Sequence, residues 1–429
     1  MKFTPLIKRL CISMAVAVGL LVFDYYIGNS RYCYTLLDDS LTFALAERFF
    51  PHDDTDDSDV LHIDVSLDKQ LAPVLEYNDT IGYIPITDRQ KLYDFLSIAR
   101  TADYRYILMD IRFEQGTDTP IDSALFSLIT SMPRLVISTH ADDNYTIADS
   151  SLLQKAAYAD FESTLFSGFT KYEYIQHGQE SVPMRMYREL DGGNIAKHGF
   201  IYSSHGSLCN NAQSIPLTAP VEYVDTTFVE EIQDDIMIFY EVQYDDTLSE
   251  AILSNDSIND NYEDSIPDKD KYRLGIDMLV RKSPEEVTKL LSGKIILIGD
   301  YTNDIHTSYV GDIPGPIIQY QAYRTLHNGN HRIKWLITVV LFLVYTAIAY
   351  LCMYFNDSHD AGKFKTFAAK HPIAISILSL LGWGSLLYIL ELIIYIICHS
   401  TFIFTIPAFI FSVLGFLTIH ITSKSDISK

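Results

Sequence analysis

Four aspartates stand where the sequence predicts strands to end, and their carboxylates could do chemistry. Asp64 and Asp110 close apolar runs, Asp300 follows a third run, and Asp304 comes four residues later. Because parallel strands gather their carboxyl ends at one edge of a sheet, we expect the carboxylates of Asp64, Asp110 and Asp300 to lie near one another. They could hold a ligand or a divalent cation, Ca²⁺ or Mg²⁺. The interpretation we favour is structural: each Asp caps the turn that follows it.

Glu391 is a further titratable residue whose position could carry function. It is the one charge in the apolar segment 373–397. A carboxylate is costly in lipid, and by default it marks a functional site. Its place near one end of the segment also fits a plainer interpretation, in which it reaches interfacial water or pairs with a neighbouring helix. Both interpretations stay open.

Other local motifs argue against common sites. The turn at Gly299 resembles the start of a phosphate loop, but neither GxxxxGK[ST] nor GxGxxG follows, which argues against a nucleotide site. HDDTDDSD (52–59) lacks the glycine and distal glutamate of a calcium loop, which favours a solvated linker. No Ser/His/Asp or Cys/His constellation stands out, so we predict no enzymatic activity. The histidines of irregular stretches are expected on the surface: His177, His198 and His205.

The composition bounds the class of protein. The chain has 429 residues, and its formal net charge is −23. The acids concentrate in residues 28–332, between apolar and weakly basic flanks, which argues against nucleic acid as a partner. The five cysteines show no metal-binding spacing, and a bridge between Cys33 and Cys209 stays open.

Hydrophobic periodicity within the acidic block predicts an α/β fold, with a mostly parallel sheet covered by helices. Near-continuous apolar strands that alternate with helices are typical of parallel pairing. The predicted strands are 60–67, 104–113 and 134–139, and the predicted helices are 86–102, with Thr87 at its N-cap, and 119–132.

The second half of the block is less regular. Residues 182–190 and 236–244 are predicted strands, whereas the acid-rich stretch 245–272 is predicted to be a mobile insertion. A helix over 283–293 carries a capping box, with Ser283 at the cap and Glu286 three residues on. GKIILIGD then predicts a central strand, and 317–329 a final helix.

Four apolar segments predict transmembrane helices, one N-terminal and three C-terminal. About 20 apolar residues are enough to cross a bilayer. A cleaved signal peptide is the alternative for the first segment, but no small-residue cleavage site follows it, so we favour an uncleaved anchor. The predicted spans are 10–27, 333–355, 373–397 and 402–421.

The distribution of Lys and Arg predicts the orientation of these spans. Basic residues mark the N-terminus 1–9, the loop 356–372 and the tail 422–429 as cytoplasmic. The block 28–332 then lies outside the cytoplasm, which in bacteria places it on the periplasmic side of the inner membrane. The short tail leaves no room within this sequence for a cytoplasmic output domain.

Two stretches carry a resemblance to a known family. ILMDIRFEQGTDTPIDSALFSLI and LSGKIILIGDYTNDIHTSYVGDIPGPIIQYQAYRTLHNG resemble the CHASE type-two domain, an extracytoplasmic sensory module of bacterial cyclases and histidine kinases. Gln319-Tyr320 stand where that family has His-Ala. The positions that match the family's pattern are Asp110, Phe113, Asp122, Gly293, Lys294, Gly299, Asp304, Pro314 and Gly315.

This resemblance implies a sensory membrane protein of the bacterial inner membrane. Its outer domain would bind a small molecule, and its helices would pass the signal to a partner signalling protein in the membrane or cytoplasm. No cofactor is required, and a homo-oligomer is compatible with the sequence. The alternatives are a membrane-embedded metal-dependent enzyme and a structural subunit of an envelope complex.

Overall fold

The computed structural model describes residues 5–28, 39–50, 59–76, 79–141, 147–161, 170–199, 201–210, 213–214, 274–308, 311–354 and 370–427. The predicted strand 236–244 and the predicted insertion 245–272 lie outside these residues, as does all but the last residue of 52–59.

A six-stranded sheet forms the centre of the domain, in the order β14–β1–β15–β4–β5–β6. All of its neighbouring strands are parallel, which confirms the predicted α/β fold class. The strand that follows most of the domain in sequence, β15, lies between β1 and β4. The strands are β14 (Leu274–Gly275), β1 (Val60–Asp64), β15 (Ile295–Gly299), β4 (Tyr106–Asp110), β5 (Leu135–Thr139) and β6 (Ala156–Tyr158).

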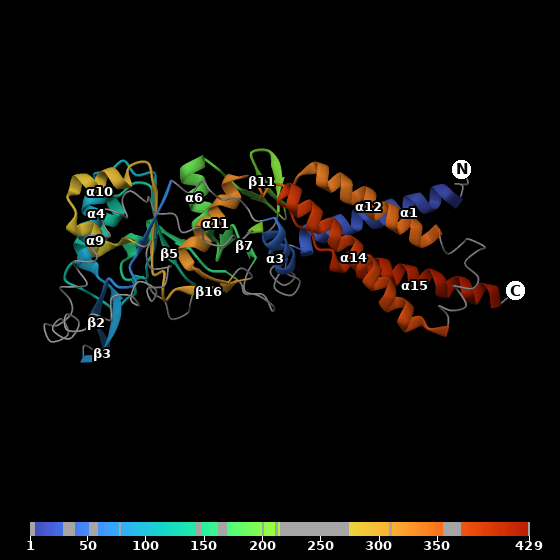
Figure 1. The fold of residues 1–429 in the computed structure, drawn as a ribbon, viewed down its shortest axis with the longest axis horizontal. Coiled ribbons are helices and arrows are strands. Elements are labelled where there is room, and N and C mark those ends of the chain that lie inside the picture. The colour runs from blue at the N-terminus through green and yellow to red at the C-terminus, as the bar shows by residue number, and fades with distance from the viewer. Residues whose placement is uncertain are drawn as a thin grey trace, which may run out of the picture.

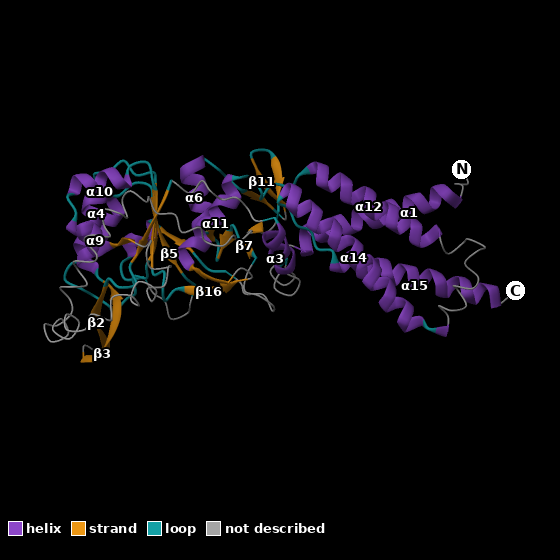
Figure 2. Ribbon diagram, viewed as in Figure 1, coloured by secondary structure: helices purple, strands orange, loops and turns teal. Residues whose placement is uncertain are grey.

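The central strands are apolar on both faces because helices cover both sides of the sheet (Figures 1 and 2). Alternate side chains of a strand point to opposite faces. Ile107 and Met109 of β4 accordingly pack on one side, and Tyr106 and Leu108 on the other. The first face is covered by α4 (Arg89–Ala99), α5 (Asp122–Ser131), α9 (Ile276–Arg281), α10 (Pro284–Leu291) and the short 3₁₀ helix η2 (Ser150–Gln154), and the second by α6 (Val182–Asp191) and α11 (Gly315–His327).

Local capping signals place several helix starts. The box predicted on α10 is present, because Ser283 accepts a hydrogen bond from the Glu286 N–H and the Glu286 carboxylate accepts from the Ser283 N–H. The cap predicted for α4 was off by one residue. Asp88 is the N-cap and accepts from two backbone N–H groups, whereas Thr87 is the last residue of β3.

The predicted strand over 182–190 is wrong, since these residues form α6. Pro183 in the first turn and Gly192 just past the end, at φ +63°, are ordinary start and stop signals of a helix. Val182 and Met186, one helical turn apart, are both buried in the core. The Met-Arg-Met alternation imitated a strand over three residues only.

Small antiparallel units decorate the sheet. The longest is the hairpin of β2 (Lys69–Glu76) and β3 (Asp79–Thr87), which projects from the domain far from the long helices (Figure 1). The others are β16 (Ile305–Ser308) with β17 (Gly311–Pro314), β7 (Lys171–Tyr172) with β13 (Gln213–Ser214), β8 (Ile175–Gln176) with β9 (Gln179–Glu180), and the three strands β10 (Ala196–His198), β11 (Ile201–Ser204) and β12 (Ser207–Cys209).

Long apolar helices extend from one end of the domain (Figure 1). Three of them are long and apolar enough to cross a membrane, over Leu6–Tyr26, Trp335–Tyr354 and Ile373–Cys398. This indicates a multi-pass membrane protein. A fourth, α15, contains the shorter apolar stretch Thr405–Leu417. The helices are α1 (Pro5–Phe23), continued by the π-helical turn η1 (Asp24–Gly28), α12 (Trp335–Tyr354), α14 (Pro372–Cys398) and α15 (Thr405–Ile427).

The domain and the long helices contact each other directly. Helix α3 (Ser40–Phe49) packs on the end of α14, where the rings of Phe43 and Tyr395 lie 4.8 Å apart. The Tyr202 N–H of β11 donates to the hydroxyl of Tyr25 at 3.2 Å. Cys209 of β12 is a buried free thiol, and its proposed partner Cys33 lies outside the described residues.

Candidate functional site

The carboxyl edge of the sheet carries the polar residues that the strand-end argument predicts. Asp64, Gly299 and Asp110 lie side by side there, on three adjacent strands. Asp300 follows β15 directly, and the hairpin of β16 and β17 folds back to deliver Asp304 and the start of α11. The predicted gathering of Asp64, Asp110 and Asp300 at one edge is therefore confirmed, and Asp304 joins them from the hairpin, but the roles of the four residues divide.

Two of the four act as caps. The carboxylate of Asp64 accepts from the N–H groups of Ser66 at 2.9 Å and Tyr301 at 3.1 Å. Asp300 accepts from the N–H groups of Thr302 and Asn303 and pairs with Lys69 Nζ at 2.8 Å. Partial burial opposes ionisation of Asp300, yet these hydrogen bonds keep its pKa below the usual range. The structural interpretation holds for both residues.

The other two, Asp110 and Asp304, converge on Gly315 at the start of α11. A Cβ at Gly315 would overlap the Asp304 carboxylate and lie 3.0 Å from Asp110 Oδ2. A Cβ at Gly299 would likewise overlap the Pro316 ring, so both glycines are needed for close approach of the strand ends to α11. The Gly315 N–H donates to the Asp304 carbonyl at 2.9 Å, which fixes the hairpin against the helix.

The negative charges of Asp110 and Asp304 are only partly compensated by their surroundings. Burial, and after it repulsion from Asp304, raise the pKa of Asp110 to about 6. Hydrogen bonding from Ser138 and the nearby rings of His140 and His306 act in the opposite direction. Asp110 therefore exchanges its proton near neutral pH, which is unusual for an aspartate and common at functional sites.

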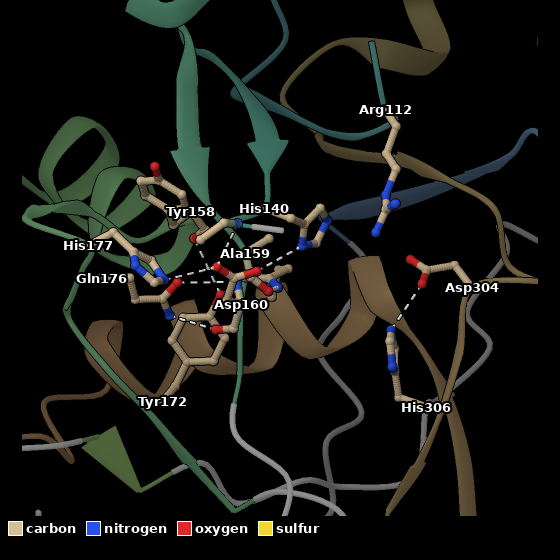
Figure 3. A network of polar contacts seen from close by, with 12 residues as sticks. Arg112, His140, Tyr158, Ala159, Asp160, Tyr172, Gln176, His177, Asp304 and His306 are labelled. Atoms are coloured by element: carbon tan, nitrogen blue, oxygen red, sulfur yellow. Dashed lines mark hydrogen bonds and ion pairs between the residues drawn. The ribbon is translucent and has the colours of Figure 1, made fainter. Parts of the chain in front are cut away.

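His140, His306 and Arg112 lie around Asp304 (Figure 3). His306 Nε2 lies 3.0 Å from Asp304 Oδ1, and its ring packs edge-on against Phe161. The Arg112 side chain points toward the space between His140 and Asp304 (Figure 3). Arg112 Nη1 lies 3.6 Å from Glu114 Oε1 and its side chain is half-exposed, so the arginine stands at the rim of the network.

A second acid, Asp160, anchors the neighbouring part of the network (Figure 3). It lies just past β6, and its carboxylate accepts a hydrogen bond from the Ala141 N–H at 3.0 Å. His140 Nδ1 lies 3.1 Å from Asp160 Oδ1, and His177 Nε2 lies 3.4 Å from Asp160 Oδ2. Although partial burial opposes it, hydrogen bonding from His140 and Ala141 lowers the pKa of Asp160. His177 was expected on the surface, and it is half-exposed but engaged.

A buried amide and a tyrosine lie beneath the network and hydrogen-bond to each other. Gln319 of α11 donates to the Ala159 carbonyl at 2.9 Å and accepts from the Tyr172 hydroxyl at 2.6 Å. Gln319 is 2% exposed. It stands where the CHASE type-two pattern has a histidine, so this polar contact is built here from an amide.

The remaining residues of the family pattern have structural positions. Phe113 is buried against Phe126 with the Arg89 guanidinium 4.3 Å above its ring, and Asp122 accepts from Thr119 at the start of α5. Gly293 turns the chain after α10 at φ +74°, the Lys294 carbonyl accepts from Arg105, and Pro314 is the N-cap of α11.

Glu391 lies away from this edge. Its side chain is 1% exposed, on the part of α14 that packs against α3 and the domain. Asp24, Asp39 and Lys171 interact with it electrostatically. Within the plainer interpretation, pairing with neighbouring elements fits this position and contact with interfacial water does not, and the functional interpretation stays open.

Within the part of the chain that the structure describes, no group of three or more His, Cys, Asp or Glu side chains is arranged to hold a metal ion. The strand-end network is a mixed set of acids, histidines and an arginine. His140 and Asp160 were not among the predicted site residues, although both follow strands and the strand-end argument could have found them. His306 and Arg112 have no comparable signal.

Comparisons with known proteins identify no relative. No family model matches the chain, and no curated protein or solved structure is significantly similar to it. The assignment of function therefore depends on the geometry of this chain alone.

Proposed function

We propose that this protein is a membrane-anchored sensor whose α/β domain binds a polar small molecule at the carboxyl edge of its sheet. The observation that carries the proposal is the meeting of Asp110 and Asp304 with His140 and His306 at that edge, with Arg112 at its rim. Packing of the core requires none of these charges, whereas ligand sites of open α/β sheets form at strand carboxyl ends.

The proposed orientation places the domain outside the cytoplasm, held by α1 before it and by α12, α14 and α15 after it. In Figure 1, α1 begins and α15 ends at the same far end of the helix group, which is compatible with four spans and both termini inside. The sensory role of a CHASE type-two-like domain fits this arrangement. A separate partner protein would receive the signal through the helices, because a ligand must favour one helix arrangement over another.

The binding step is tested on the full chain in detergent. Fractions of aqueous envelope extract are screened for an increase in melting temperature, since a ligand that binds the folded state stabilises it. We expect an active fraction to shift the wild type but not His306→Ala. His198→Ala, a change of an exposed histidine on β10, is the matched control and keeps the shift.

A structural subunit gives a different result. If no fraction shifts the wild type, or if His306→Ala responds like His198→Ala, the strand-end network is not the binding site. Photocrosslinking of the helices in membranes, with and without the active fraction, then tests transmission: unchanged helix contacts and partners would contradict the sensor role.

A further inference from the structure

A buried cluster of charged groups lies where the domain contacts the long helices. Lys171 of β7 pairs with Asp39, the N-cap of α3, at 3.2 Å, and both side chains are less than 5% exposed. Glu391 of α14 and Asp24 of η1 complete the cluster, and each interacts electrostatically with Asp39 and Lys171. Three carboxylates therefore share one ammonium group.

This imbalance cannot persist with every carboxylate ionised. A buried charge is tolerated when it is paired or neutralised, and an unpaired one instead changes its protonation state. The ammonium of Lys171 is committed to Asp39. The Asp24 carboxylate accepts a hydrogen bond from the Ile403 N–H at 3.0 Å, which stabilises its ionised form. Glu391 receives a hydrogen bond from the Thr42 side chain, which compensates its charge only in part, and a proton is the simplest compensation for the rest.

Unpartnered polar atoms support this assignment independently of the charge count. Among the described residues, Glu391 Oε2 and the Tyr345 hydroxyl are buried without a hydrogen-bond partner. The Tyr345 side chain is 0% exposed and interacts electrostatically with both Asp24 and Glu391. A protonated Glu391 gains an O–H donor that a carboxylate lacks, and so it can satisfy an oxygen of this kind.

We propose that Glu391 is a proton-binding site, occupied at neutral pH while Lys171 is paired with Asp39. The titratable groups that face it come from five elements: Asp24 of η1, Asp39 at the cap of α3, Lys171 of β7, Tyr345 of α12 and Tyr388 of α14. A sodium ion is the competing cation, but the described acids show no metal-binding arrangement.

Strand β7 connects this proton site to the strand-end network. Lys171 contacts the cluster, and the next residue, Tyr172, donates to Gln319 beneath the network. A displacement of β7 that parts Lys171 from Asp39 would free the ammonium for Glu391 and release its proton. Linkage to a ligand in this way rests on the proposed function, whereas the proton site itself does not.

The test is infrared spectroscopy of the full chain in lipid nanodiscs at neutral pH. Asp110, with a pKa of about 6, contributes a carbonyl band of its own at this pH. We expect a second band of a buried carboxylic acid that is lost in Glu391→Gln while the Asp110 band remains. Glu391→Gln has the shape of the protonated acid and should keep the fold. Glu285→Gln, a change of an exposed acid on α10, is the control and keeps both bands. Absence of the second band in the wild type, or its survival in Glu391→Gln, overturns the proposal.

A second variant tests the cause with Glu391 intact. In Asp39→Asn the Lys171 ammonium loses its partner, so it should pair with Glu391, ionise it and remove the second band. Persistence of the band would overturn the stated role of the ion pair. Exchange of potassium for sodium at constant pH should leave the wild-type band unchanged, and a decrease with sodium would assign the site to that ion instead.

Discussion

At the scale of single residues, the aspartates at the sheet edge show how one residue type takes opposite roles. Asp64 accepts two backbone N–H groups, which stabilise its charge. Asp110 lies on β4, which is separated from the strand of Asp64 by β15. It is desolvated beside Asp304, and its pKa is raised. The same carboxylate is therefore a structural cap at one position and a desolvated, readily protonated group at the other.

Substitution at these two positions should have opposite effects on stability. Because the pKa of Asp110 is raised to about 6, the folded state binds the extra proton, and wild-type stability falls as pH rises from about 4 to 6. Asp110→Asn should thus stabilise the protein at neutral pH by about 1–3 kcal/mol and flatten this pH dependence. Asp64→Asn should destabilise it. Thermal melts of the full chain decide the matter, and a lower melting temperature for Asp110→Asn would contradict the prediction.

His331 gives the reverse pH dependence. It is fully buried between Tyr174 and Tyr187, and burial lowers its pKa to about 4, with repulsion from Arg332 and His205 adding to the effect. The unfolded chain therefore binds the extra proton between about pH 6.5 and 4, and stability falls as pH falls through that window.

His331→Phe keeps the aromatic contacts and cannot be protonated. It should remove up to about 3 kcal/mol of acid destabilisation, with little change at pH 8. The measurement is the melting temperature against pH for both proteins. Parallel curves for the wild type and His331→Phe would mean that protonation of this ring does not cause the loss of stability at acid pH.

At the scale of elements, the packing of α11 against the strand ends depends on glycines. Gly315 leaves room for two carboxylates, and Gly299 leaves room for Pro316. Such positions have no periodicity signal, yet they decide whether a helix can reach a sheet edge.

Gly315→Ala should therefore destabilise the domain. The new methyl group overlaps the Asp304 carboxylate, and overpacking of this kind costs about 1–3 kcal/mol. Gly82→Ala in β3 meets open space and serves as the control. The melting temperature and the infrared signature of Asp110 are compared for both variants. Equal stability of the two would show that α11 shifts freely.

At the scale of the whole molecule, the position of the domain relative to the membrane is the property on which the proposed function depends. The apolar helices leave the domain at one end, and the strand-end network and the buried charge cluster are joined through β7. In the proposed sensor, β7 is one of the elements through which a ligand on the domain would influence the helices.

Cysteine labelling tests this placement. In a background without the five native cysteines, Glu285→Cys on α10 should react with an impermeant maleimide in intact cells. Lys370→Cys, just before α14, should react only after permeabilisation, because the loop 356–372 is predicted to be cytoplasmic. The reverse pattern would place the domain in the cytoplasm and contradict the proposed orientation.

Local sequence determined much of this protein because local physics is short-ranged. Apolar runs fixed β1, β4, β5 and β15, as well as the long helices, and the box at Ser283 and Glu286 fixed the start of α10. Strand-end position was enough to bring Asp64, Asp110 and Asp300 to one edge. The alternation of apolar and polar residues over Met184, Arg185 and Met186 was enough to predict a strand where α6 forms.

Tertiary structure alone decided which residues meet. The insertion of β15 between β1 and β4 pairs segments about two hundred residues apart, and only that pairing sets Asp304 and His306 against Asp110. The burial of Glu391 against Lys171 and Asp39 likewise joins three distant segments. Periodicity reports the environment of a residue along its own element, whereas a partner from another element depends on strand order and helix packing, which have no local signal.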